Sequence, residues 1–470
     1  MASPSQLRAH GIGFWLWLTC ASLLLIFFSF FLGAWAVRHA TIGDGNSRFS
    51  EQQVEIILYI ADFPWYARNA IEELWSQRKG EAAPQLMERK VVERPEWQRH
   101  FPAPEDSGYL LFSGIDPIAG KTVIKLIRVA DGTIMGRWFP DADRINDHIT
   151  GNNAPKVNWR HLRAQHPLLL DDGDIIYNTS FLLVRQKPCD TRPVWVLDET
   201  MHHSNEMDVS GKAFWVGAVA RDSFPENSWL RDKIRDDALA LVSLDGKLLE
   251  KRSILKILKD NGLEAIALGT SGLQTPTDPI HVNQIRVARI DSRYWKRGDL
   301  LVSARNISTV FLYRPSTNKI IWYRIGPWLN QHSANFIDDH RISVFNNNVV
   351  SGPEEEGQKL FLNPQETSQV QVYDFDTDKV SRPFQKLLAS VRLRSVTEGR
   401  ARVLPDGGLY IEETNYGRHL RFTKDKLLWS RVNDYDEEHV GMVSWSRYLT
   451  ADEARIPLQA LVSLQCKPQQ

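Results

Sequence analysis

Residues 299–322 read DLLVSARNISTVFLYRPSTNKIIW, and this stretch decides the fold class. It places a short β-rich strand at 299–302 before a gap, and then a polar turn at 318–319 that leads into apolar residues ending at Trp322. Short strands rich in Val, Ile, Leu and aromatic residues and bounded by turn residues are typical of antiparallel sheets. The same pattern recurs along the chain, which indicates an architecture of repeated sheets.

Six such units lie between residues 107 and 445. The paired segments are 109–112 with 131–138, 173–177 with 192–195, 213–216 with 245–249, 299–302 with 318–322, 342–345 with 378–380, and 408–411 with 425–429. Sheets repeated in this way predict an all-β fold, a six-bladed β-propeller, because radial repetition leaves few exposed edges. A β-sandwich also has many short strands, but it does not explain six matched units.

The composition fits a large ordered core and excludes one class of partner. Of the 470 residues, 43% are apolar and 16 are tryptophan. We interpret the tryptophans that follow the turns as wedges between blades rather than as cofactor contacts. Basic and acidic residues number 57 each, with no basic block, so the sequence predicts no nucleic-acid partner.

The three cysteines say little about the compartment. Cys20 lies in the apolar N-terminus, and the sequence alone does not show whether Cys189 pairs with Cys466. No CxxC, HExxH or other zinc-type spacing occurs. We therefore predict no structural metal site and no cofactor.

Residues 11–37 form an uncharged apolar run of 27 residues that follows a tail at 1–10. About 20 apolar residues suffice to span the hydrocarbon core, so this run predicts a transmembrane anchor in contact with the lipid bilayer. A cleaved signal peptide is the alternative, because Ala34-Trp35-Ala36 resembles a cleavage site. The run is, however, longer than the usual apolar region of about 7–15 residues. Basic residues on both sides leave the orientation undecided.

Residues 50–80 predict a short helical segment. Ser50 and Gln53 have capping-box spacing, and apolar residues follow at helical intervals until Pro64 interrupts them. We interpret this segment as a stalk, or as a brace packed on the propeller. The C-terminal segment at 446–470 closes the ring, caps it or packs outside it, and the sequence does not choose among the three.

Polar residues recur where loops lead into and out of the strands that we predict to be innermost. Such loops converge on the central channel of a propeller. Three histidines at corresponding places in successive units indicate one shared site. In chain order the candidates are His202 and His203 before the third unit, His281 and Asn283 before the fourth, Arg305 after strand 299–302, His332 before the fifth unit, and Asn346 after strand 342–345.

Neutral imidazoles around a guanidinium suit the chemistry of an anionic oxyester. Arginine offers a planar fork of donors for sulfonate or phosphate oxygens. A histidine can attack sulfur or phosphorus, and its neighbours can exchange a phenolic proton near neutral pH. A histidine cluster can also bind a transition metal, but no carboxylate recurs beside the histidines, so we favour the metal-free interpretation.

Five segments resemble the bacterial arylsulfotransferase (aryl-sulfate sulfotransferase) family. They are HHSNEMD at 202–208, DPIHVNQI at 278–285, DLLVSARN at 299–306, KIIWYRIG at 319–326 and NQHSANFIDDHRISVFNNN at 330–348. The resemblance covers the region 107–445. It implies a propeller outside the cytosol that transfers a sulfuryl group between phenols through a sulfohistidine, without a nucleotide sulfate donor. It thereby predicts aryl sulfates and phenols as small-molecule partners.

The same resemblance assigns roles to the candidate residues. It makes His332 the nucleophile, His203 and His281 the partners in proton transfer and anion stabilisation, and Arg305 the holder of sulfate oxygens. It leaves substrate binding to a second group, which comprises His202, Asn283 and Asn346. One departure is the Asn-Asn-Asn tract at 346–348, where the family pattern has an Asp-Asn pair.

Together these interpretations predict a single-pass protein of the bacterial inner membrane, with its propeller in the periplasm. Two alternatives stay open at this point. One is a non-catalytic propeller that serves as a binding or assembly module at the membrane, because a fold does not fix an activity. The other is a quinone-dependent or metal-dependent oxidoreductase on the same scaffold.

The two N-terminal segments are separable by truncation. We predict that removing residues 1–49 releases a soluble domain, because the apolar run is lost. If 50–80 is a brace, removing 1–80 exposes apolar surface and causes aggregation. Size-exclusion chromatography of the two truncated chains distinguishes the outcomes, and a monodisperse shorter chain would identify 50–80 as a stalk.

Overall fold

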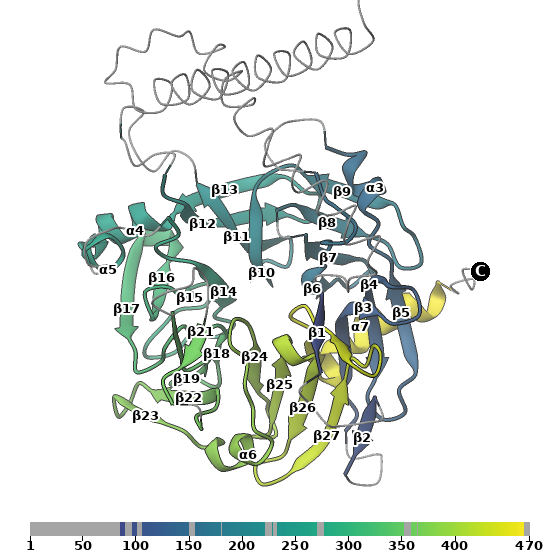
Figure 1. Cartoon of the computed structure of the whole chain (residues 1–470). Helices are drawn as coiled ribbons and strands as arrows, with labels where there is room; N and C mark the ends of the chain where they lie inside the picture. The colour runs from purple at the N-terminus through teal and green to yellow at the C-terminus, as the bar shows by residue number, and fades with distance from the viewer. Residues whose placement is uncertain are drawn as a thin grey trace, which may run out of the picture. The chain divides into compact units, whose positions relative to one another are not determined.

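The computed structural model describes residues 85–89, 96–100, 106–149, 156–179, 181–220, 228, 233–269, 277–351, 359–363 and 365–464. Its strands form six main sheets around a central axis, which confirms the six-bladed β-propeller (Figure 1). The predicted anchor at 11–37 and helical segment at 50–80 lie outside the described residues. No helix within the described ranges is long and apolar enough to cross a membrane. Cys189 is disulfide-bonded, and the other two cysteines lie outside the described residues.

The first three blades are antiparallel four-stranded sheets. Blade 1 contains β29 (Arg447–Leu449), β3 (Tyr109–Asp116), β4 (Lys121–Arg128) and β5 (Ile134–Trp138). Blade 2 contains β6 (Gln165–Leu169), β7 (Ile175–Asn178), β8 (Leu183–Gln186) and β9 (Pro193–Leu197). Blade 3 contains β10 (Met201–Met207), β11 (Ala213–Ala220), β12 (Asp236–Ser243) and β13 (Leu248–Ser253).

The other three blades repeat this order from the channel outward. Blade 4 contains β14 (Val282–Val287), β15 (Leu300–Ala304), β16 (Thr309–Arg314) and β17 (Lys319–Ile325). Blade 5 contains β18 (Ala334–Phe336), β19 (Arg341–Asn346), β22 (Gln369–Asp374) and β23 (Lys379–Ser381). Blade 6 contains β24 (Arg400–Val403), β25 (Leu409–Glu413), β26 (Arg418–Phe422), β27 (Leu427–Val432) and β2 (Trp97–Arg99).

Short elements decorate the ring. Two small pairs of strands join β1 (Leu86–Glu88) to β28 (His439–Gly441) and β20 (Val349–Ser351) to β21 (Lys359–Phe361). The helices are α3 (Ala142–Asn146), α4 (Ile254–Asp260), α5 (Glu264–Leu268), α6 (Gln385–Ser390) and α7 (Ala451–Ser463). Two single turns of 3₁₀ helix lie at Pro315–Thr317 and Thr414–Tyr416.

The sequence pattern missed the innermost strand of the blades. The segments predicted as inner strands, such as 213–216 and 299–302, belong to β11 and β15, which are second in their sheets. The true inner strands β10 and β14 read MHHSNEM and VNQIRV. β10 is mostly polar, and polar residues interrupt the apolar ones in β14, so neither strand shows the apolar run by which the other strands were recognised. His202 and His203 therefore lie within an inner strand, and not in a loop before one.

The C-terminal segment closes the ring. β29 pairs antiparallel with β3, so the inner strand of the first blade comes from the far end of the chain. The ring thus extends beyond residue 445, where we predicted that it ends. The sequence did not predict this extension, because a three-residue strand that pairs over such a distance has no local sequence pattern. α7 follows directly and begins with a capping box between Thr450 and Glu453. Its Leu461 is buried in the core between blades 1 and 2.

The core of the described residues is a ring of six apolar clusters, each shared by two neighbouring blades. Trp138 lies between blades 1 and 2, Trp195 between blades 2 and 3, Trp322 between blades 4 and 5, and Trp429 between blades 1 and 6. These side chains are wedges between blades, as predicted. Because each blade is packed on both faces, the channel-lining strands are held in fixed positions.

Glu412 of β25 fixes the segment that leads into β29. Its carboxylate is fully buried. It accepts hydrogen bonds from the backbone N–H groups of Trp445, at 2.8 Å, and Ser446. The hydroxyl of Thr414 donates a third at 2.6 Å. Burial raises the pKa of Glu412, but His419 and these hydrogen bonds outweigh burial and hold the pKa below its ordinary value.

We predict that Glu412→Gln weakens the attachment of β29, the strand that closes the ring. The amide replaces an acceptor with a donor that faces backbone N–H groups, so the free energy of unfolding falls by about 2–4 kcal/mol. Urea unfolding followed by tryptophan fluorescence measures the change. Glu199→Gln, at a partly exposed ion pair with Lys251, is the matched control and costs less than about 1 kcal/mol. Equal losses in the two variants would contradict this role.

Candidate active site

The predicted site residues meet at one rim of the channel, where the inner strands begin. His202 and His203 are at the start of β10, His281 directly precedes β14, and His332 is two residues before β18. The ring centroid of His203 lies 5.4 Å from that of His202 and 5.2 Å from that of His281. His332 is close enough for its charge to act on His203, and Arg305 acts on His332 in the same way.

The hydrogen bonds around His332 define its tautomer. Its Nδ1 lies 2.7 Å from the side-chain oxygen of Asn347. The amide nitrogen of Asn347 donates to the carbonyls of Ser395, at 2.7 Å, and Glu398, at 2.8 Å, so the oxygen of this amide faces the ring. Nδ1 therefore donates, and the neutral ring keeps its lone pair on Nε2. This Nε2 is buried and has no hydrogen-bond partner in the described part of the chain.

His203 is oriented by the adjacent His202. The Nε2 of His202 donates to the carbonyl oxygen of Ala218, at 2.9 Å, and also lies 3.3 Å from the carboxylate of Asp237. In the neutral ring its Nδ1 is then an acceptor, and this atom lies 3.3 Å from the Nδ1 of His203. His203 donates from Nδ1, so its lone pair is also on Nε2.

His281 is oriented by a carboxylate. Its Nδ1 donates to Asp278, three residues earlier in the same loop, at 2.5 Å. The side chain of Asn306 donates to the backbone carbonyl of Asp278 at 2.6 Å and secures the loop. The φ of His281 is +53°, a left-handed conformation that is rare for residues with a Cβ and is enriched at functional sites. A carboxylate behind a histidine stabilises the protonated ring, so His281 is the best-equipped proton acceptor of the three.

The site keeps its imidazoles neutral. Burial lowers the pKa of His332 and of His203 well below the ordinary value, because a charged ring loses its hydration. The charge of Arg305 lowers the pKa of His332 further, against smaller effects of Asn347 and of the Asn330 backbone. Burial also lowers the pKa of His281, although Asp278 opposes it. Near neutral pH each of these rings offers an uncharged Nε2.

Arg305 brings positive charge to this rim. Its Nε donates to the side chain of Asn306 at 2.9 Å, and its backbone N–H donates to the carbonyl of His281 at 3.0 Å. Among the described residues, no carboxylate forms an ion pair with its guanidinium. Burial lowers the pKa of Arg305, but an arginine stays protonated in proteins. Its remaining N–H groups are donors for an anion.

The sequence did not predict five residues of the site, of which Asp237 on β12 is the carboxylate beside His202. Asp278 and Asn347 adjoin predicted residues in the sequence, and their donor and acceptor chemistry was the signal that could have found them. His166 and Trp445 lie in blades without a recognised motif. Their rings stack at a centroid distance of 4.4 Å, and Trp445 lies edge-on to His203 at 5.1 Å. This aromatic wall is suited to contact with an aryl group.

Two predicted substrate-binding residues, Asn346 and Asn283, use their side chains for hydrogen bonds within the protein. The side-chain oxygen of Asn346 accepts from the backbone N–H groups of Leu329, at 2.8 Å, and Asn348, at 2.9 Å. Asn283 donates to the carbonyl of Gln331 at 2.9 Å, and its side-chain oxygen is buried without a partner among the described residues. Within the 346–348 tract, Asn347 is the residue that contacts His332.

The side chains that lie close enough together to hold a metal ion are not those of the channel rim. Among the described residues, His340 forms such a group with Asp338 and Asp339, and another with Asp374 and Asp376. Both groups are partly exposed, and neither includes a histidine of the channel rim. The rim histidines instead have their Nδ1 atoms engaged by an amide, an imidazole and a carboxylate.

The sequence and the fold were compared with known proteins. A family model described as Arylsulfotransferase (ASST) matches residues 166–433. A solved protein of unknown function from Bacteroides caccae is 14% identical over 73% of this chain and 99% of its own, with a TM-score of 0.43. TolB from Acinetobacter baumannii is 11% identical over 74% of this chain and 67% of its own, with a TM-score of 0.38. No curated protein matches the chain.

We predict that protonation of His332 lowers the free energy of unfolding in acid. Its pKa is lower in the folded chain than the value of about 6.5 in the unfolded chain, so between those two values the unfolded chain binds more protons. The free energy of unfolding therefore falls as the pH drops below about 6.5, by at most about 1.4 kcal/mol per pH unit. Urea unfolding between pH 7 and pH 5 measures this slope.

The slope becomes shallower in His332→Gln, which cannot take up the proton. His148→Gln is the matched control, because His148 is exposed on the surface. If the wild-type chain and His332→Gln lose stability equally between pH 7 and pH 5, the ring of His332 is not held neutral by the fold.

Proposed function

Because the chain belongs to the arylsulfotransferase family, we propose that it transfers a sulfuryl group from an aryl sulfate to a phenolic acceptor through a sulfated His332. One observation carries this assignment to His332. Its Nε2 is buried, bears the lone pair and is without a hydrogen-bond partner among the described residues, while its Nδ1 is held by Asn347. A nucleophile needs a lone pair and a fixed orientation, and this atom has both.

In the first half-reaction the Nε2 of His332 attacks the sulfur of the aryl sulfate. The N–S bond forms as the bond between sulfur and the aryl oxygen breaks, and the phenolate leaves with that electron pair. The guanidinium of Arg305 contacts the sulfuryl oxygens, whose charge is then met by fixed donors in a site shielded from water. The stacked rings of Trp445 and His166 contact the aryl group.

In the second half-reaction the acceptor phenol attacks the sulfur of the sulfated histidine. The new S–O bond forms, the N–S bond breaks, and the lone pair returns to Nε2. His281 accepts the phenolic proton on its own Nε2, because Asp278 stabilises the imidazolium that results. This proton goes to the leaving phenolate of the next transfer, so protons balance over the cycle. The Nε2 of His203, whose ring lies beside that of His281, is a second acceptor for the phenolic proton.

The membrane anchoring and the compartment belong to the same proposal. The apolar run at 11–37 supports a single span, and the disulfide at Cys189 fits an oxidising compartment such as the periplasm. A propeller on that side of the membrane works on compounds that reach the cell from outside. It also needs no nucleotide sulfate donor, because the sulfuryl group comes from another aryl ester.

We predict that the full-length chain releases nitrophenolate from p-nitrophenyl sulfate over many turnovers only when a phenol is added. Without an acceptor the reaction stops after one sulfuryl group per chain, and mass spectrometry of rapidly quenched protein finds the added group on the peptide that contains His332. In His332→Ala, turnover falls by at least about 10³-fold, because the nucleophile is lost. Absorbance of nitrophenolate measures the rate.

The exposed His148 is the matched control, and His148→Ala retains wild-type turnover. Turnover that survives in His332→Ala would disprove the proposed nucleophile. Failure of the wild-type chain to release nitrophenolate with any phenol tested would favour the alternative function, a propeller that binds a ligand or partner without transferring a group.

A further inference from the structure

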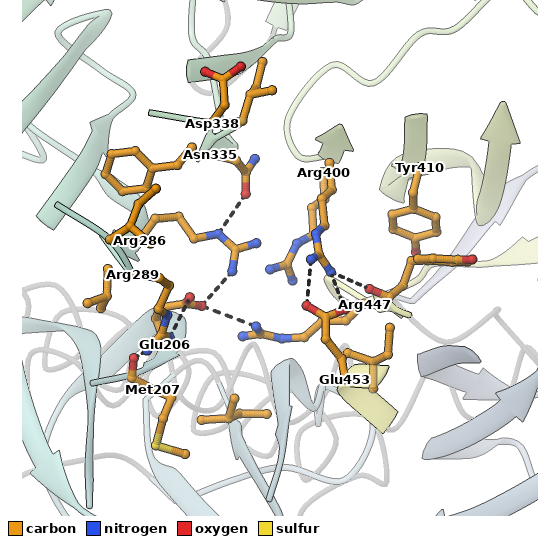
Figure 2. Close-up of a pocket in the computed structure, with 18 of the residues that line it drawn as sticks. Glu206, Met207, Arg286, Arg289, Asn335, Asp338, Arg400, Tyr410, Arg447 and Glu453 are labelled. Atoms are coloured by element: carbon orange, nitrogen blue, oxygen red, sulfur yellow. Dashed lines mark hydrogen bonds and ion pairs between the residues drawn. The ribbon is translucent and has the colours of Figure 1, made fainter. Parts of the chain in front are cut away.

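A cavity lies toward the opposite rim of the channel from the histidines, beside the ends of β10 and β14. It has a volume of about 420 Å³. Glu206 at the end of β10, Arg286 at the end of β14 and Arg400 at the start of β24 line it, together with Arg447 of β29 (Figure 2). None of these residues takes part in the sulfuryl transfer proposed above.

The cavity contains more positive charge than its carboxylates neutralise. Arg286 lies 2.7 Å from the carboxylate of Glu206, and Arg289 and Arg447 each lie 3.4 Å from it. The two other acidic residues that line the cavity have partners of their own. They are Glu453, 2.7 Å from Arg402, and Asp338, 2.5 Å from Arg341.

Arg400 increases this excess. Its side chain is 3% exposed, and its hydrogen bond in the described structure is to the carbonyl of Trp445, at 3.1 Å. No carboxylate of the described residues forms an ion pair with it. With Arg286, Arg289 and Arg447 it makes four guanidinium groups around the single carboxylate of Glu206. Burying unpaired charge is costly, and arginine does not release its proton to avoid the cost, so the cavity is built to receive an anion.

Tyr410 gives an independent indication of a ligand. Its side chain is 1% exposed, it lines the cavity, and its hydroxyl has no hydrogen-bond partner among the described residues. A buried hydroxyl normally has one. Tyr410 is directly opposite Arg402 in the pairing of β24 with β25, so this donor lies on the strand next to the one that carries Arg400 (Figure 2).

Part of the lining is apolar. It includes Leu168, Met207, Val287, Trp295 and Phe336. A bare inorganic ion would leave these side chains without contacts, whereas a cavity of this size matches the volume of small-molecule sites. The combination of a guanidinium cluster with an apolar wall is complementary to an amphipathic anion.

We propose that this cavity binds an organic ester of sulfate or phosphate, with the oxyanion at Arg400, Arg447 and Tyr410 and the apolar body against Trp295 and Phe336. The guanidinium fork matches the geometry of either oxyanion. The inference does not rest on the proposed sulfuryl transfer, because it uses a different set of residues at the other rim. Trp445 separates the two sites, since its ring contacts His203 and its carbonyl accepts from Arg400.

The test is isothermal titration of the full-length chain with phenyl phosphate, which carries no sulfuryl group to transfer. Saturable binding with a Kd below about 1 mM is expected. In Arg400→Gln the Kd rises at least about tenfold, because a charged donor is lost. In Tyr410→Phe, which removes one oxygen and preserves the ring, it rises about threefold. Inorganic phosphate binds at least about threefold more weakly than phenyl phosphate, because it has no apolar body.

Two control variants locate the binding. Arg324→Gln removes an arginine that pairs with Asp378 on the outside of the ring, and it leaves the Kd unchanged. Arg305→Gln weakens any binding of phenyl phosphate at the histidine rim, whereas the binding component that Arg400→Gln weakens keeps its wild-type Kd. The proposal is overturned if the wild-type chain does not bind phenyl phosphate, or if Arg305→Gln abolishes binding while Arg400→Gln and Tyr410→Phe do not. Equal affinity for inorganic phosphate would exclude the ester.

Discussion

The inner strands of the propeller run in the same direction along one channel, and the rest of the site depends on this constraint. The histidines at or just before the start of β10, β14 and β18 meet at one rim, and residues at the end of β10 and β14 meet Arg400 of β24 and Arg447 of β29 toward the other. His203 and Glu206 are only three positions apart in β10, yet they belong to different clusters. Tight packing between blades fixes the inner strands. The loops that carry His281 and His332 are then held by hydrogen bonds to Asp278 and Asn347.

Three histidines at the first rim are held in the same way by three different groups. Each donates from Nδ1, to the amide of Asn347, the imidazole of His202 or the carboxylate of Asp278. Each consequently has its lone pair on Nε2. The difference between the partners separates the roles, because a carboxylate stabilises an imidazolium more strongly than a neutral amide does. The ring behind Asn347 is thus better suited to attack sulfur, and the ring behind Asp278 to accept a proton.

The sequence predicted the parts of the fold whose signals are local. Apolar strands with polar turns identified the second and fourth strands of the blades but not the third, and the count of six blades was confirmed. The inner strands escaped because polar side chains along a channel look like loop sequence. Ring closure by β29 escaped because three residues paired with a strand more than 300 positions earlier leave no pattern in their own neighbourhood.

The sequence likewise predicted only those residues of the candidate site that lie near a recognisable strand. His203, His281, His332 and Arg305 were found because they stand beside recognisable strands in consecutive units. His166 and Trp445 were not, since the sequence contains nothing that connects them to those units. Their place in the site depends on the stacking of blades 1 and 2 around the ring, which only the three-dimensional structure shows.

Burial has opposite consequences at the two rims. A histidine that loses its hydration releases its proton, so the imidazoles of the first rim are uncharged and reactive beside the charge of Arg305. An arginine cannot do so, and the guanidinium groups at the second rim stay charged in surroundings that hydrate them poorly. Glu206 neutralises only part of that charge. The first rim therefore has the properties required for chemistry on a neutral nucleophile, and the second has those required to hold an anion without changing it.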